Sequence, residues 1–119
     1  MTSASELVLY THPMSRGRIA RWMLEEVGVS YERVLIDIRD PAAKADPAFR
    51  AVSPMGKVPA LEDGPVRLWD SGAICLYLAD RHPAAGLAPA ITDPDRGAYL
   101  QWVLYTNAVI EPAMAEKFS

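Results

Sequence analysis

The stretch LVLYTHPMSRGRIARWMLEEVGVSYERVLI, residues 7–36, decides the fold of this chain. Residues 7–11 are mostly apolar and predict a short buried strand. Apolar residues then recur at helical spacing over 15–27, which predicts a helix, and residues 31–36 are rich in strand formers. A strand, a helix and a strand in this order predict two parallel strands joined by a right-handed crossover.

The ends of these elements carry their own signals. Pro13 has no N–H to donate to a sheet, so the first strand is expected to end before it. Ser15 is suited to cap the N-terminus of the helix. Gly28 is suited to end the helix, because glycine readily adopts the left-handed conformation found there.

A second unit follows a connecting stretch. Residues 37–54 hold three prolines and predict a connection with at most a short helix at 48–52. The segments VPALED (58–63) and VRLW (66–69) flank a Gly-Pro turn and predict an antiparallel hairpin. Helical spacing over 71–81 predicts a helix after the hairpin. We therefore expect an α/β domain of order β-α-β, linker, β-β-α.

The end of the chain predicts one more helix. Residues 82–91 are rich in proline and predict a linker. Thr92 or Asp93 is suited to cap the helix that follows, and Pro112 is expected to kink or stop it. No second helix follows for its apolar face to pack against. We therefore expect this helix to be the first of an α-helical domain whose remainder is absent.

Length and composition limit the classes of function. A chain of 119 residues holds one main module, and its net charge of −3 gives no basic field for nucleic acid. The single Cys75 cannot form an intrachain disulfide, no Cys/His cluster has zinc spacing, and no apolar run is long enough to span a membrane. We expect a soluble, cytoplasmic protein with no metal, membrane or nucleic-acid partner.

The start of the first helix is the first segment suited to chemistry. Arg16, Arg18 and Arg21 lie in the half of the helix where cations oppose its dipole. A negative ligand docked there would be favoured by the free N–H groups and by the guanidinium groups, and Ser15 is close enough to donate a hydrogen bond. The alternative is a capping serine beside a solvated arginine face.

Two further segments offer polar groups to a ligand. In SPMGKVPAL, residues 53–61, Pro59 begins a predicted strand. A cis bond before Pro59 would leave Val58 free to pair with a peptide-like ligand, whereas a trans bond would make this an ordinary edge strand. Asp70 and Ser71 precede a helix, where either alone suits an N-cap. Together they suit the ammonium and the carboxylate of an amino acid.

In this order and spacing, the three segments resemble the N-terminal, thioredoxin-like domain of cytosolic glutathione S-transferases, particularly the bacterial ones. The resemblance covers roughly Leu7 to Arg81. It implies a glutathione-binding domain over 1–84 and, over 92–119, the first helix of a truncated α-helical C-terminal domain. It also implies glutathione as co-substrate, a small electrophile as the second substrate, a role in detoxification and a homodimer of the full-length protein.

The resemblance assigns roles to individual residues. In the family, the proline of the V-P-A-L segment is cis and the residue before it pairs with the cysteinyl part of glutathione, which implies these roles for Pro59 and Val58. The acidic-Ser pair, here Asp70 and Ser71, holds the γ-glutamyl end. Lys57 stands where a basic residue often lies near the glycine end.

Two hydroxyl groups are candidates for the catalytic role. Ser15 resembles the hydroxyl of the serine-type classes, and Tyr10 lines up with that of the tyrosine-type classes when the helices are aligned on Arg21-Trp22. We favour Ser15, because a loop hydroxyl at a helix N-terminus can donate to a thiolate without leaving the sheet, with Arg16 assisting by its charge. A hydrogen bond and a positive field lower the pKa of a thiol from about 8.5, and the thiolate then attacks an electrophilic carbon.

Two other functions are compatible with the same fold. A glutaredoxin-like oxidoreductase needs a cysteine at the start of the first helix, where this chain has MSRG. A non-catalytic module would keep the glutathione pocket without conjugating anything, because in the family the helical domain supplies most of the electrophile site.

Overall fold

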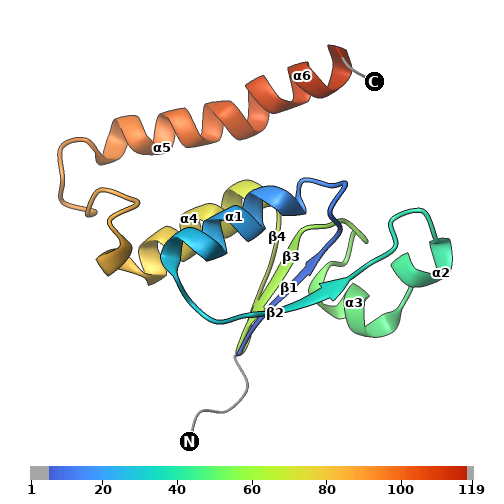
Figure 1. The fold of residues 1–119 in the computed structure, drawn as a ribbon. Helices are drawn as coiled ribbons and strands as arrows, with labels where there is room; N and C mark the ends of the chain where they lie inside the picture. Colours follow the sequence, from blue (N-terminus) through green and yellow to red (C-terminus); the bar gives the residue numbers. More distant parts are fainter. Residues whose placement is uncertain (1–5, 118–119) are drawn as a thin grey trace, which may run out of the picture.

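The computed structural model of the chain describes residues 6–117 (Figure 1). Its first unit consists of β1 (Leu7–Thr11), α1 (Gly17–Val27) and β2 (Glu32–Leu35), with β1 and β2 parallel. The predicted β-α-β unit is therefore confirmed. Gly28 ends α1 in the left-handed conformation, with a φ of 74°, as expected for a residue without a side chain.

The second unit adds an antiparallel hairpin to the same sheet. β3 (Ala60–Asp63) pairs antiparallel with β1 and with β4 (Val66–Trp69), so the strand order is β2-β1-β3-β4. The helix α4 (Ser71–Arg81) follows β4 directly. This mixed sheet is the thioredoxin-like arrangement that the sequence predicts.

The alternation of side chains along the strands divides the core between the two faces of the sheet. Leu9 and Leu61 are fully buried on the face covered by α1 and α4, which lie side by side in Figure 1. On the opposite face, Ala60 packs with Phe49 and Val52. Neighbouring residues of a strand point to opposite faces of the sheet, so Ala60 and Leu61 of β3 contribute to the two core clusters on opposite sides.

The connecting stretch contains two short helices, α2 (Pro41–Lys44) and α3 (Pro47–Val52). The carboxylates of Asp40 and Asp46 accept N–H bonds of 3.0 and 3.1 Å from the first turns of α2 and α3. The helix predicted at 48–52 is confirmed, whereas α2 is not predicted. The signal for α2 is the Asp-Pro pair, since a capping aspartate followed by proline is a favoured helix start.

The start of α1 differs from the prediction. Arg16 rather than Ser15 occupies the N-cap position, although the Ser15 hydroxyl still accepts the N–H of Gly17 at 3.0 Å. A Cβ atom on residue 17 would lie 1.8 Å from Oγ1 of Thr11. The end of β1 and the start of α1 can therefore approach each other this closely only because residue 17 is glycine.

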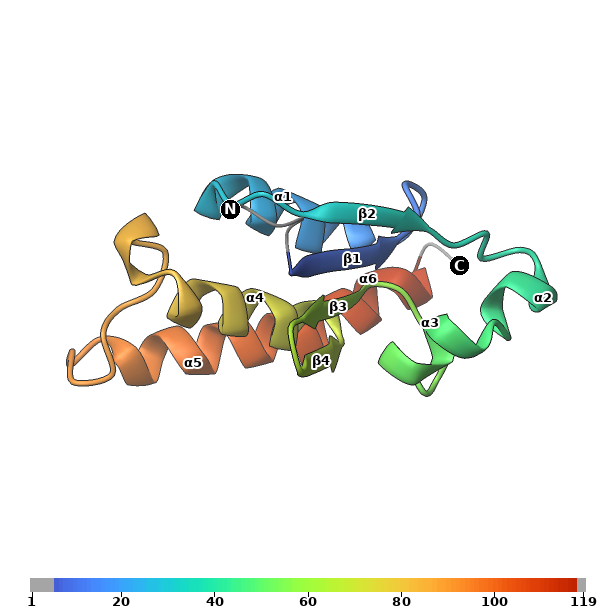
Figure 2. The same cartoon turned by 90° about the horizontal axis from the view of Figure 1, so that it is seen from below.

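The last part of the chain is a helical rod that lies over α4 on the side away from the sheet (Figures 1 and 2). It consists of α5 (Arg96–Tyr105), the π-helical turn η2 (Thr106–Ile110) and α6 (Glu111–Lys117). Pro112 does not stop the rod, so that alternative is wrong. The helical hydrogen-bond pattern instead changes in η2, which ends two residues before Pro112, a residue with no N–H to donate to the helix.

The helical rod begins a few residues after the two residues predicted to cap it. The helix starts at Arg96, and the Asp93 carboxylate accepts the N–H of Asp95 at 2.8 Å within a turn before it. Thr92 and Asp93 are therefore not its N-caps. Within residues 6–117, no helix is both long enough and apolar enough to cross a bilayer.

Candidate functional site

The strand register brings the three candidate segments to one end of the sheet. Tyr10 of β1 lies opposite Ala60 of β3, and Ala60 lies opposite Trp69 of β4. The residues adjoining these pairs on the same side, Thr11, Pro59 and Asp70, are therefore neighbours at this end of the sheet. The first turn of α1, the loop before β3 and the N-terminus of α4 all meet there.

The loop before β3 is held from beneath by a buried serine. The Ser53 hydroxyl donates to the carbonyl of Lys57 at 2.8 Å and accepts the N–H of Lys57 at 3.0 Å, and Ser53 is fully buried. The Val58–Pro59 peptide bond is cis. Among residues 6–117, no hydrogen bond uses the N–H or the carbonyl of Val58. The loop thus presents an unpaired peptide group in a fixed conformation.

Arg50 fixes the other end of this loop. Its guanidinium donates to the carbonyls of Lys44 and Pro54, at 2.8 Å in each case. Gly56 has a φ of 68°, and a Cβ atom there would lie 3.0 Å from the Arg50 guanidinium. Sequence analysis did not identify Ser53 or Arg50 as supports, because neither residue follows a spacing rule that connects it with the loop.

The N-terminus of α4 presents both a carboxylate and free N–H groups. Asp70 has a φ of 130°, and its Oδ2 caps the helix by accepting the N–H of Ala73 at 3.0 Å, as predicted. Asp70 is exposed, while Ser71 is only 3% exposed. Within the described part of the chain, the N–H groups of Ser71 and Gly72 have no acceptor.

Ser15 lies at the end of α1 that faces this edge. Its hydroxyl donates to the carbonyl of His12 at 2.6 Å and is half-buried. It lines an open hollow of about 670 Å³ whose other walls include Met14, Arg16 and Trp22. Rotation about its Cβ–Oγ bond would release the hydroxyl proton from the His12 carbonyl.

Tyr10 occupies the opposite face of the sheet. Its ring packs against Phe49 of α3, with the ring centres 5.9 Å apart, and its hydroxyl donates to Oε1 of Glu62 at 3.4 Å. Burial, followed by the negative charge of Glu62, raises the pKa of Tyr10. The structure therefore separates Tyr10 from Ser15 instead of bringing the two hydroxyl groups together.

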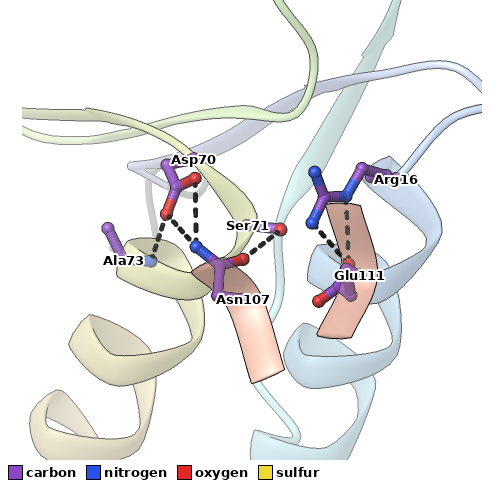
Figure 3. Close-up of polar contacts among 6 residues, drawn as sticks. All are labelled: Arg16, Asp70, Ser71, Ala73, Asn107 and Glu111. Carbon is purple, nitrogen blue, oxygen red and sulfur yellow. Dashed lines mark hydrogen bonds and ion pairs between the residues drawn. The ribbon is translucent and has the colours of Figure 1, made fainter. Parts of the chain in front are cut away.

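Two residues of the helical rod reach the site, and sequence analysis did not predict them (Figure 3). Glu111 accepts from Nε of Arg16 at 3.0 Å. The Asn107 amide group donates to both carboxylate oxygens of Asp70, at 3.2 and 3.4 Å. The only sequence signal for this pair is its spacing, because residues four positions apart lie on one face of a helix.

Cys75 is partly buried on α4. Burial, followed by the nearby carboxylates of Glu111 and Asp70, raises the pKa of its thiol to about 11. The thiol is therefore protonated near neutral pH and is a poor nucleophile. In residues 6–117, no group of three His, Cys, Asp or Glu side chains is arranged to hold a metal ion.

Comparison with known proteins decides the family. A family model for the N-terminal domain of glutathione S-transferases matches residues 5–80. The chain belongs to the glutathione S-transferase family. This confirms the resemblance, and the sheet order agrees with the thioredoxin-like domain of these transferases.

Individual glutathione S-transferases and related proteins match over most of the chain. "Disulfide-bond oxidoreductase YfcG" of Escherichia coli is 30% identical over 91% of this chain and 52% of its own length. "Glutathione S-transferase F10" of Arabidopsis thaliana is 32% identical over 82% of this chain and 45% of its own length. A sphingomonad glutathione S-transferase, solved in complex with glutathione, is 34% identical with a TM-score of 0.79, over 94% of this chain and 56% of that chain. The chain thus spans about half the length of the relatives it matches.

Proposed function

We propose that this chain binds glutathione at the edge where α1, the cis-proline loop and α4 meet, and that it activates the thiol for transfer to a small electrophile. The observation that carries the proposal is the register that brings the end of β1, Pro59 and Asp70 together. Each of the three segments offers a different polar group there. The glutathione seen in the related sphingomonad enzyme supports the same ligand.

The available groups would bind the tripeptide along its whole length. Its cysteinyl part would pair with the free peptide groups of Val58, as an added strand pairs with a sheet edge. Its γ-glutamyl ammonium would bind the Asp70 carboxylate, and its carboxylate would bind Ser71 at the N-terminus of α4. Lys57, which is exposed, would attract the glycine carboxylate.

The position of Ser15 supports it as the catalytic hydroxyl. Ser15 lies at the start of α1 and lines the open hollow, whereas Tyr10 donates to Glu62 on the face covered by α3. Arg16 would add positive charge, although its ion pair with Glu111 weakens that field. We therefore assign the thiolate hydrogen bond to Ser15 and a smaller electrostatic role to Arg16.

The proposed reaction begins with loss of the thiol proton to solvent. A hydroxyl hydrogen bond and a nearby guanidinium favour the thiolate, so its fraction at neutral pH rises. The sulfur then forms a bond to an electrophilic carbon, and the leaving group departs with the bonding electrons. The apolar walls of the hollow, Met14 and Trp22, would suit an apolar electrophile.

We also propose the domain boundaries implied by the resemblance. Residues 1–84 would form the glutathione-binding domain, and 92–119 would supply the first helix of the helical domain that completes the electrophile site. The Arg96–Asp80 ion pair and the Asn107 contacts support a fixed orientation of that helix. The family also supports a cytoplasmic homodimer of the whole protein with a role in detoxification.

Glutathione titration and conjugation assays test the proposed function. Wild type, Ser15→Ala and Tyr10→Phe should all bind glutathione. Ser15→Ala should lose about 10²-fold in conjugation of 1-chloro-2,4-dinitrobenzene, the low end of what a positioned proton-handling group contributes. Tyr10→Phe should conjugate like wild type. If both variants conjugate like wild type, the assignment of a catalytic hydroxyl is wrong, and binding without any conjugation would favour a non-catalytic module.

One specific observation favours a second function. The relative YfcG is named a disulfide-bond oxidoreductase. Since Cys75 is protonated near neutral pH, the attacking thiolate in this chain would be that of bound glutathione. It would form a mixed disulfide with one sulfur of the substrate and release the other as a thiolate. Reduction of hydroxyethyl disulfide that survives Cys75→Ser and is lost in Ser15→Ala would support this function.

A further inference from the structure

The Asn107 side chain touches both residues that we assign to the γ-glutamyl end. Its Nδ2 lies 3.2 Å from Oδ2 and 3.4 Å from Oδ1 of Asp70, and its Oδ1 accepts from the Ser71 hydroxyl at 3.5 Å (Figure 3). Asn107 comes from η2, far along the chain from α4. One amide group therefore connects the rod to two site residues at once.

The close approach of the Asn107 side chain to α4 depends on a glycine. A Cβ atom on residue 72 would lie 2.8 Å from Cγ of Asn107, closer than such atoms come in proteins. The amide group therefore lies directly over the first turn of α4. A π-helical turn at this point changes the direction of side chains relative to an α-helix, and such turns are frequent at functional sites.

The chemistry of the contacts identifies what Asn107 can do. An amide carries one donor and one acceptor side, so it can hold a carboxylate and a hydroxyl together. It carries no charge, and Asp70 remains exposed. A ligand ammonium can therefore still bind Asp70, with a charge-assisted bond stronger than that of the amide.

We propose that Asn107 is a positioning residue for γ-glutamyl recognition. It holds the Asp70 carboxylate and the Ser71 hydroxyl in the orientation that receives the ligand's ammonium and carboxylate. This inference rests on the proposed function, and it adds that specificity for the γ-glutamyl end is set partly by the helical rod. Asn107 acts through Asp70 and Ser71, without contact with the thiol.

The test compares two ligands on three proteins. The ligands are glutathione and glutaryl-cysteinyl-glycine, which lacks only the α-ammonium group. The proteins are wild type, Asn107→Ala and the control Gln101→Ala, which removes an amide from an exposed position in α5 of the same rod. Affinities come from calorimetry, and KM and kcat come from conjugation.

Asn107→Ala should weaken glutathione binding about three- to tenfold, the size expected for losing one hydrogen-bonding side chain. Its affinity for the deaminated ligand should fall less, because that ligand makes no bond to Asp70. KM for glutathione should rise while kcat stays near the wild-type value, and Gln101→Ala should change nothing.

Three results would overturn the inference. Tighter binding by Asn107→Ala would mean that the amide blocks the site. Equal losses for both ligands would mean that the residue only supports the fold. Unchanged binding would remove the role while leaving the proposed function intact, whereas a wild-type chain that binds no glutathione would overturn the proposed function itself.

Discussion

The sheet unit and the helical rod of this chain are held by different forces. In the sheet unit, Leu9, Leu61 and Ile74 are fully buried between the strands and the helices α1 and α4. In the rod, no residue of α5 or η2 is buried. The rod is instead fixed by polar contacts, of which the Arg96–Asp80 pair is the most complete. Apolar burial therefore builds the fold, while polar contacts determine where the rod meets the site.

The strongest way to break this comparison is to remove the same side chain from each region. Leu61→Ala should lower the free energy of unfolding by about 2–5 kcal/mol, because it leaves a cavity in a closed core. Leu104→Ala, at a position that is 56% exposed in α5, should change it by less than about 0.5 kcal/mol. Urea unfolding measures both. Similar losses would show that the rod has an apolar core contact of its own.

A pair of glycine substitutions sharpens the same contrast with a smaller effect. Gly17→Ala places a Cβ atom 1.8 Å from Oγ1 of Thr11 and should destabilise the chain by about 1–3 kcal/mol. Gly97→Ala meets nothing within 4 Å and should stabilise α5 by about 0.5–1 kcal/mol through helix propensity. Thermal unfolding of the two variants should shift in opposite directions. A shift in the same direction would contradict the close β1–α1 contact.

The ion pair between Glu111 of the rod and Arg16 of α1 predicts a smaller effect, on activity rather than on stability. Glu111→Gln removes the carboxylate that pairs with Arg16 and leaves the guanidinium free to act on a bound thiol. Conjugation below neutral pH should rise about twofold, the scale of an exposed ion pair. Glu26→Gln is the matched control, since it removes an equal charge from α1 at an exposed position. A loss of activity in Glu111→Gln would mean that the pair itself orders the site.

The smallest expected effect is the response of the rod to acid. The hydrogen bond from Arg96 lowers the pKa of Asp80. The stabilisation from this pair is therefore complete above the unfolded pKa of about 3.9 and is lost as pH falls through the lower folded value. Hydrogen exchange in α5 should accelerate below about pH 4 in wild type, relative to the amides of β1. Asp80→Asn should show fast exchange in α5 already at neutral pH.

The two regions also differ in how far the sequence predicts them. The strands, α1, the hairpin and α4 follow from hydrophobic spacing and from punctuation such as Gly28, because local patterns and core burial agree there. The prediction begins α1 at the wrong residue. The start of the helix depends on the close approach of Gly17 to Thr11, and no local sequence pattern contains that approach. The rod's caps are misplaced, and of the two alternatives for Pro112 only the stop is wrong, because local capping signals alone do not fix where a helix starts or ends.

The candidate site shows the same limit. The sequence proposes Ser15, Val58 and Asp70 as site residues because each lies in a motif at an element boundary. Asn107 and the buried Ser53 are not found. Their partners lie 36–37 and 4 residues away along the chain, and no sequence pattern links either residue to its partner. Sequence motifs thus identify the groups that would face the ligand, and the structure adds the groups that hold them.

Direct observation of bound glutathione tests the central claim. In amide NMR spectra of the chain titrated with glutathione, the signals of Val58, Ser71 and Gly72 should shift together and saturate with one dissociation constant. The ultraviolet absorbance of the bound thiolate should be present in wild type and reduced in Ser15→Ala, which should still bind. Saturable shifts confined to another surface, or no binding by wild type, would contradict a glutathione site at this edge of the sheet.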